Sequence, residues 1–190
     1  MAKKEFSSFQ TFLTLFLVCL FSAGILSAVY ILTKEPIREA KEQEKQDALK
    51  VVLPPETEDI EMVTVQKEQE EYNVYIAKDS GGNVTGYALE TMTSQGYGGN
   101  IRFLLGLDEN GKIYNYYITQ HSETPGLGDN LRSDSFKSQF KGRDLENFTF
   151  KVEKDGGDVQ AITAATISSR AACDALKKGL ERFEDFSRGE

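Results

Sequence analysis

Hydrophobic and polar positions follow two different patterns along the chain: one unbroken apolar run near the N-terminus, then segments in which apolar and polar residues alternate. The run from Phe6 to Thr33 contains no charged residue, and Lys34 ends it. A membrane-spanning helix needs about 20 predominantly apolar residues. We therefore predict a short N-terminal tail over residues 1–8 and one transmembrane helix over residues 9–33.

A cleaved signal peptide is the alternative interpretation of this run. The small residues Ser22-Ala23-Gly24 resemble a cleavage site, but apolar residues continue past them to Leu32, which favours an uncleaved anchor. Lysine and arginine occur on both sides of the run, so their distribution does not decide which side of the membrane holds the N-terminus.

A segment rich in charged residues follows over residues 34–55. Its apolar residues form only a thin stripe, which is typical of a solvated helix, and Pro54-Pro55 end it. We predict a charged helical stalk or linker here and a separate domain over residues 56–190. The stripe consists of Ile37, Ala40, Ala48, Leu49 and Val52.

Apolar residues in the predicted domain recur at about every second position, the period of half-buried strands. The sequences Asp79-Ser80-Gly81-Gly82-Asn83 and Asp108-Glu109-Asn110-Gly111 are turn signals that favour antiparallel pairing of successive strands. We expect strands at 62–65, 72–76, 84–92, 100–107, 112–120 and 148–152, and helices at 133–140 and 169–183. The predicted fold class is α+β: an antiparallel β-sheet domain with packed helices, preceded by one transmembrane helix.

The composition argues against several classes of function. The net charge is −8, and no basic patch interrupts the acidity, which argues against nucleic-acid binding. Cys19 lies in the apolar run and Cys173 in the last predicted helix, so we expect neither a disulfide nor a cysteine-based metal site. His121 is the sole histidine and cannot form a histidine-rich metal site. We expect no metal ligands and no catalytic residue.

Three short stretches carry candidate chemistry. Glycines in Gln95–Asn100 and in His121–Asp129 allow close approach of the backbone to a flat ligand, and Pro125-Gly126 makes a tight turn. In the third stretch, Ala161–Arg170, Thr166 should lie at the start of the last helix, where free N–H groups and the helix dipole receive a phosphate. Plain helix capping is the alternative role of this hydroxyl.

In this order the three stretches resemble the FMN-binding domain family over about residues 72–180. Thr163-Ala164-Ala165-Thr166 is similar to the core of that family's flavin attachment motif, Ser/Thr-Gly-Ala-Thr, whose last threonine carries FMN through a phosphoester bond. The resemblance implies covalent FMN on Thr166. It further implies cofactor contacts from Thr163, Ala165, Ser168, Glu123, Thr124, Leu127, Gly128, Gly98 and Gly99.

Particular roles follow from the resemblance. Leu127 would pack on the isoalloxazine ring, Thr163 and Ser168 would donate hydrogen bonds to the phosphate, and the charge of Glu123 would shift the flavin potential. Two positions depart from the family's pattern. Ala164 stands where the family has glycine, a small change unless the position needs a positive φ. Gln160 stands where the family usually has the aspartate that a flavin transferase reads.

With its anchor and short length, the chain is most similar to the RnfG family of Rnf electron-transport complexes. The resemblance implies an electron carrier in a membrane-bound, ion-translocating ferredoxin:NAD+ oxidoreductase. The N-terminus would be cytoplasmic and the domain extracytoplasmic. Its partners would be the other membrane subunits and a flavin transferase, and the complex, not this chain, would hold the substrate sites.

Two alternatives stay open at this point. One is the NqrC family of the Na+-translocating NADH:quinone reductase, which has the same type of domain. The other is a membrane-anchored scaffold or sensor that keeps the fold but has lost the flavin, which Gln160 favours.

Overall fold

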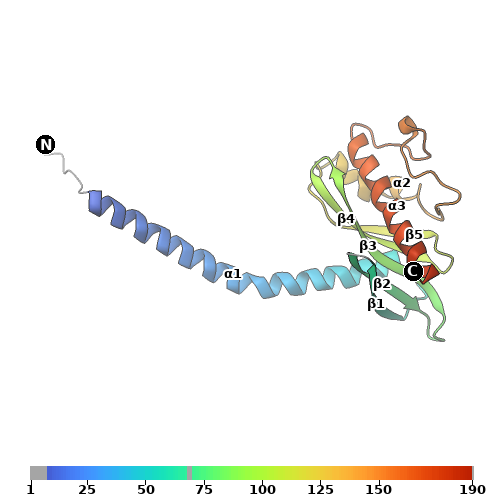
Figure 1. Ribbon diagram of the computed structural model, residues 1–190, viewed down its shortest axis with the longest axis horizontal. Helices are drawn as coiled ribbons and strands as arrows, with labels where there is room; N and C mark the ends of the chain where they lie inside the picture. Colours follow the sequence, from blue (N-terminus) through green and yellow to red (C-terminus); the bar gives the residue numbers. More distant parts are fainter. Residues whose placement is uncertain (1–7, 68–69, 190) are drawn as a thin grey trace. The chain divides into compact units, whose positions relative to one another are not determined.

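The computed structural model describes residues 8–67 and 70–189 (Figure 1). The expected tail over residues 1–8 lies outside the described residues apart from Ser8, where the first helix begins. The chain divides into two compact units, Met1–Glu44 and Lys45–Glu190, and the boundary between them falls within helix α1, Ser8–Val52.

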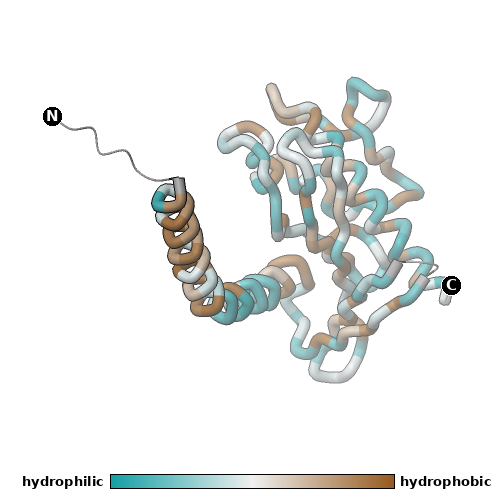
Figure 2. Tube along the Cα trace, turned by 60° about the vertical axis from the view of Figure 1, so that its left-hand side comes forward, coloured by the Kyte–Doolittle hydropathy of each residue, from teal (hydrophilic) through white to brown (hydrophobic). Residues whose placement is uncertain are grey.

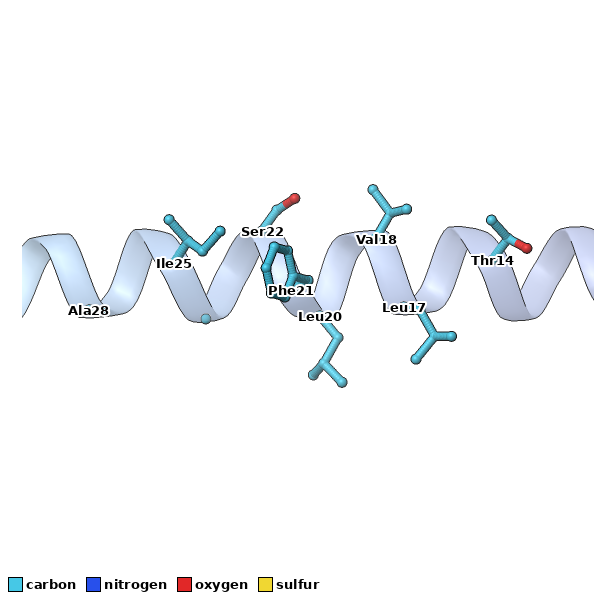
Figure 3. Close-up of a pocket in the computed structure, with 9 residues that line it drawn as sticks. Thr14, Leu17, Val18, Leu20, Phe21, Ser22, Ile25 and Ala28 are labelled. Carbon is cyan, nitrogen blue, oxygen red and sulfur yellow. The ribbon is translucent and has the colours of Figure 1, made fainter.

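The first unit contains the apolar part of α1, a helix long and apolar enough to cross a membrane. Hydrophobic residues cover the first half of the helix and hydrophilic residues the second (Figure 2). In Figure 3 the side chains of Leu17, Phe21 and Ile25 project outward from the helix in different directions. A helix that is apolar all round is typical of a membrane span.

Two hydroxyl groups of the apolar run are satisfied within the helix itself. Thr14 Oγ1 donates to Gln10 O at 2.8 Å, and Thr33 Oγ1 donates to Val29 O at 2.8 Å. A membrane interior offers no water, so polar groups there need partners inside the protein. These hydrogen bonds satisfy the hydroxyls of Thr14 and Thr33 within the helix.

The second unit contains a five-stranded sheet in which every strand pairs antiparallel with the next one along the chain. This meander confirms the predicted antiparallel pairing of successive strands. The predicted turns join them: Asp79 Oδ1 accepts the N–H groups of Gly81 and Asn83, each at 2.8 Å. The strands are β1 Asp59–Lys67, β2 Glu70–Lys78, β3 Val84–Gly96, β4 Gly99–Asp108 and β5 Ile113–Gln120.

Helix α3, Thr166–Arg188, lies across one face of the sheet (Figure 1). It starts earlier than the expected residue 169, so Thr166 is its first residue. Small residues on α3, such as Ala172 and Ala175, let it pack closely on large strand residues such as Leu105. This main core also contains Leu89, Ile101, Phe103, Leu107, Ile113, Tyr116, Ile118, Leu176 and Leu180.

The last turns of α1 contribute to a second core. Leu49 is 1% exposed and Val52 is fully buried, and both belong to a cluster with Tyr75 and Leu104 of the sheet. Lys45 Nζ also pairs with Glu90 at 2.6 Å. Of the stripe that the sequence suggested was solvated, Ala48, Leu49 and Val52 are therefore buried, while Ile37 and Ala40 are exposed. The second compact unit begins at Lys45, within α1.

Two expected elements differ in the structure. The helix expected over 133–140 is reduced to α2, Asp134–Lys137. The strand expected over 148–152 is absent from the described residues: the segment is irregular and has only an isolated bridge between Val152 and Val159. Apolar and polar residues alternate here because Phe148 and Phe150 both pack into an aromatic cluster around Phe140. The alternating pattern therefore comes from burial of the two rings and not from pairing with a neighbouring strand.

Leu49→Ala should lower the free energy of unfolding of the domain by about 2–4 kcal/mol, because it removes a buried side chain from the second core and leaves a cavity. Val51→Ala is the matched control, since Val51 is 48% exposed on the same turn and should change stability by less than about 0.5 kcal/mol. Urea unfolding of the full chain in detergent measures both. Equal stability of the two variants would contradict the role of α1 in the core.

Candidate functional site

The three predicted stretches meet at a cavity of about 530 Å³. Tyr97 comes from the hairpin between β3 and β4, Leu127 from the loop after β5, and Thr166 from the start of α3. The other lining residues are Glu123, Thr124, Gly128, Ala164, Ala165, Ile167 and Ser168. The larger hollow shown in Figure 3 is lined by side chains of α1 alone, so it is the surface of a single apolar helix and not a ligand site.

Thr166 lies one residue inside the helix and is not its cap. The N-cap residue is Ala165, which makes no side-chain cap hydrogen bond. The N–H groups of the first turn therefore lack the side-chain acceptor that usually satisfies one of them. With the positive end of the helix dipole, these donors form a favourable environment for a phosphate next to the Thr166 hydroxyl.

The turn before α3 holds a strained residue. Ala165 N donates to Ile162 O at 3.0 Å, which closes a β-turn with Ala164 at its third position. Ala164 has φ = 61° and is the sole non-glycine residue with positive φ in the described part of the chain. Glycine is favoured at such a position because it lacks a Cβ. This explains physically why glycine suits the attachment motif, and it means that alanine is not a neutral replacement there.

Ser169 holds this turn in place from the helix. Its buried hydroxyl accepts the N–H of Ile162 at 3.0 Å and donates to Ala165 O at 3.0 Å. A strained backbone conformation persists where its surroundings determine it. The two hydrogen bonds of Ser169 do so directly beside Thr166.

Glu123 connects all three stretches through one carboxylate. Its side chain is buried, with 6% exposure. Oε1 accepts the N–H of Gly98 at 2.9 Å, and Oε2 accepts the hydroxyl of Ser168. Two positions close to Glu123 in space require glycine. A Cβ on Gly98 would overlap the Ser122 carbonyl, and a Cβ on Gly128 would overlap the Glu123 carboxylate.

The hydrogen-bonding pattern changes the roles expected of two residues. The Ser168 proton is donated to Glu123, so in this structure it does not point at a phosphate. Both oxygens of Glu123 are engaged within the protein, so this residue shapes the cavity wall in addition to carrying charge. Glu123 thus lines the cavity and also joins the hairpin at Gly98 to helix α3 at Ser168.

Not every expected site residue lies at this cavity. Thr163 lines a neighbouring polar cavity of about 550 Å³, together with Gln160 and Gly126. Gly98 and Gly99 are not among the lining residues, although Gly98 reaches the wall through Glu123. The main chain of Gln160 is held by the side chain of Gln139, which accepts its N–H at 2.7 Å and donates to its carbonyl at 3.3 Å.

Three lining residues, Tyr97, Ala164 and Ile167, are absent from the contacts predicted from the sequence. Tyr97 is 71% exposed and Ile167 is 47% exposed, and with Leu127 at 40% they give the cavity an apolar rim. A tyrosine within a glycine-rich turn was the available signal for the first. The isoleucine falls on the first turn of α3, where the sequence pattern does not distinguish a rim residue from an ordinary surface position.

Two groups near the start of α3, the Arg170 guanidinium and the Cys173 thiol, are not available for chemistry at the cavity. The Arg170 guanidinium forms two hydrogen bonds to Asp155, at 2.6 and 2.8 Å, and holds the pKa of that carboxyl below its usual value. Burial raises the pKa of the Cys173 thiol to about 12, which makes it a poor nucleophile. Neither group competes with Thr166, whose hydroxyl lines the cavity at the start of α3.

The residues present fit FMN. The rim offers apolar surface to a flat ring system, the glycines permit close backbone approach, and the N-terminus of α3 suits a phosphate. This fold and site define an FMN-binding domain, and the FMN-binding domain family matches residues 96–181, which contain the whole cavity lining. The RnfG N-terminal region matches residues 9–52.

Similarity to curated proteins extends over nearly the whole chain. It is 31% identical over 189 residues to the G component of the proton-translocating ferredoxin:NAD(+) oxidoreductase complex of Clostridium ljungdahlii, covering 99% of this chain and 98% of that protein. It is 34% identical over 178 residues to the G component of the ion-translocating oxidoreductase complex of Escherichia coli, covering 87% and 86%. The chain belongs to the RnfG family of ion-translocating oxidoreductase complexes.

A solved structure shares the fold. The crystal structure of the C component of the Na(+)-translocating NADH-quinone reductase from Parabacteroides distasonis aligns with a TM-score of 0.50 and 19% sequence identity, covering 68% of this chain and 77% of that one. At this identity the likeness shows the fold alone.

Ala164→Gly should leave stability unchanged or raise it by up to about 1 kcal/mol. Relief of the left-handed strain, about 1–2 kcal/mol, outweighs the extra backbone entropy of glycine in the unfolded chain, about 0.5–1 kcal/mol. Ala165→Gly is the control, because Ala165 has φ = −132° and gains no such relief; it should destabilise. Thermal unfolding compares them, and a destabilised Ala164→Gly variant would argue against strain at this turn.

Glu123→Ala should lower the free energy of unfolding by about 2–4 kcal/mol, since it removes the acceptor of two donors and leaves the buried ones unsatisfied. The control is Glu109→Ala in the exposed β4–β5 turn, expected to change stability by less than about 0.5 kcal/mol. Urea unfolding measures both variants. A Glu123→Ala variant as stable as Glu109→Ala would show that the carboxylate does not hold the three stretches together.

Proposed function

We propose that this chain is the flavin-carrying, RnfG-type component of a membrane-bound, ion-translocating ferredoxin:NAD+ oxidoreductase, with FMN esterified to Thr166. The observation that carries the proposal is the position of Thr166: it opens α3 and lines the cavity formed by the three flavin-motif stretches. The similarity to RnfG-type proteins over almost their full length supports the same function for the whole chain.

Each part of the site has a distinct task in this proposal. The first turn of α3 binds the phosphate through its N–H groups and dipole. Tyr97, Leu127 and Ile167 exclude water from the ring and supply apolar contact. Glu123 keeps the walls at a fixed separation. When bound, FMN supplies the one- and two-electron chemistry of an electron carrier.

Covalent attachment suits a carrier that stays with its complex. We propose that residues 9–33 anchor the chain in the cell membrane with the N-terminus in the cytoplasm, and that the FMN-binding domain lies outside it. An ester bond prevents loss of the cofactor where free FMN is scarce. The proposed partners are the other membrane subunits, which deliver and accept electrons, and a flavin transferase, which attaches FMN.

The principal rival is a membrane-anchored module without flavin. Gln160 supports it, because it replaces the aspartate of the attachment motif. In the structure Gln160 lines the neighbouring cavity and not the one at Thr166. The substitution therefore bears on recognition by the transferase and leaves the flavin cavity itself unaltered.

Protein purified from its native host should carry FMN on the peptide that contains Thr166. Intact mass should exceed that of the chain by FMN less one water, and the denatured band should fluoresce under ultraviolet light. Thr166→Ala should abolish both signals, because it removes the ester oxygen. Thr64→Ala is the matched control, since Thr64 is an exposed residue of β1 outside the cavity and outside the motif, and it should retain FMN. Wild-type protein that is dark and of unmodified mass would overturn the proposal in favour of the flavin-free module.

A further inference from the structure

We infer that His121 is a positioning residue of the flavin site: as a neutral ring with its proton on Nε2, it closes the loop His121–Asp129 and so fixes Glu123 and Leu127 at the cavity. The inference rests on the proposed function for its significance, although the geometry that supports it belongs to the protein alone.

The hydrogen bonds of the imidazole determine its tautomer. Nδ1 of His121 is the acceptor for the backbone N–H of Glu123, at 3.1 Å. A backbone N–H can only donate, so Nδ1 carries no proton and the proton of the neutral ring is on Nε2. Nε2 lies 3.3 Å from Asp129 Oδ1. The ring thus accepts a hydrogen bond from the start of the loop and lies within ion-pair distance of the carboxylate at its end.

These two contacts enclose the residues that face the cofactor. Within the loop, Leu127 N and Asp129 N both donate to the carbonyl of Thr124, at 3.1 and 3.3 Å. Leu127 and Gly128, which line the cavity, lie between these bonds. A loop closed at both ends and across its middle has little freedom, so a change at His121 moves the apolar wall of the site.

The contact at Glu123 has the larger consequence. His121 holds the main chain of the residue whose carboxylate binds Gly98 N–H and Ser168 Oγ. The imidazole therefore positions the backbone of Glu123, and the Glu123 carboxylate in turn joins the three stretches. Its side chain is only 13% exposed, so water does not readily replace it as the acceptor.

One carboxylate faces the ring at Nε2, and it favours a proton on that nitrogen. Asp129 Oδ1 faces Nε2 and also lies 3.7 Å from Nε of Arg132, so this carboxylate is shared between the two side chains. The Glu123 carboxylate belongs to the same loop but is already bonded on both oxygens. A second proton on Nδ1 would place a donor against the Glu123 N–H and break that contact.

Two substitutions separate the two contacts. In His121→Asn the amide oxygen takes the place of Nδ1 and accepts the N–H two residues on, as in an Asx-turn. In His121→Gln the longer side chain reaches toward Asp129 but has no acceptor near the Glu123 N–H. We expect His121→Gln to increase hydrogen exchange of the Glu123 amide about five-fold, equivalent to about 1 kcal/mol for a lost hydrogen bond. His121→Asn should restore protection toward the wild-type value.

The experiment uses the full chain from its native host in detergent micelles. Three measurements apply: ¹⁵N shifts of the single imidazole, exchange of the Glu123 amide, and visible circular dichroism of the bound flavin. We expect the wild-type spectrum of an Nε2–H tautomer, and we expect His121→Gln, but not His121→Asn, to alter the flavin dichroism. Thermal unfolding verifies that both variants are folded.

Three results would overturn the inference. They are a proton on Nδ1 in the wild-type protein, a His121→Gln variant with wild-type exchange and dichroism, and a His121→Asn variant that behaves like His121→Gln. A wild-type chain without FMN would instead overturn the proposed function. The tautomer and the amide exchange would still be measured in that case, so the two failures are distinguishable.

Discussion

The flavin site depends on one buried carboxylate that has no cation beside it in the described structure. A buried charge of this kind is tolerated where hydrogen bonds surround it, and Glu123 obtains them from Gly98 N–H and the Ser168 hydroxyl. These partners come from a β-hairpin and from the last helix, while Glu123 itself lies in the loop after β5. Three segments far apart in sequence must therefore approach each other, and the cavity is the space left between them.

The attachment turn illustrates the same dependence on surroundings. Ala164 keeps a left-handed conformation that alanine disfavours, and Ser169 of α3 supplies the two hydrogen bonds that hold the turn. Thr166 follows directly, at the point where the helix exposes its first N–H groups. The strained residue, the start of the helix and the Thr166 hydroxyl thus lie within residues 164–166, and the helix that carries Thr166 also stabilises the turn before it.

Packing of α3 and of the end of α1 in the two cores of the domain holds these segments in place. Helix α3 packs on one face, and the last turns of α1 contribute to the second core. Leu49 and Val52 are part of the domain and not of a free tether. The end of the anchoring helix is therefore built into the fold of the flavin domain, so that domain cannot complete its second core without those turns.

The sequence by itself determined the features that follow from local patterns. The apolar run from residues 9 to 33, the turns at Asp79–Asn83 and Asp108–Gly111, the antiparallel order of strands and the placement of Thr166 at the start of α3 all follow from periodicity, turn chemistry and motif. Most of the cavity lining, including Leu127, Gly128 and Ser168, also follows from the motifs. Such patterns encode burial and backbone dihedral angles, which neighbouring residues largely set.

Only the tertiary structure decided which groups become partners. It placed Ala48, Leu49 and Val52 in a core, although their stripe was too thin to distinguish burial from solvation. It left Phe148 and Phe150 without a partner strand, separated Thr163 from Thr166 into adjoining cavities, and directed the Ser168 proton to Glu123. Each of these outcomes depends on contacts between residues distant in sequence. Alternation, spacing and motif order describe only neighbouring residues, so they do not identify the distant residue that a side chain will contact.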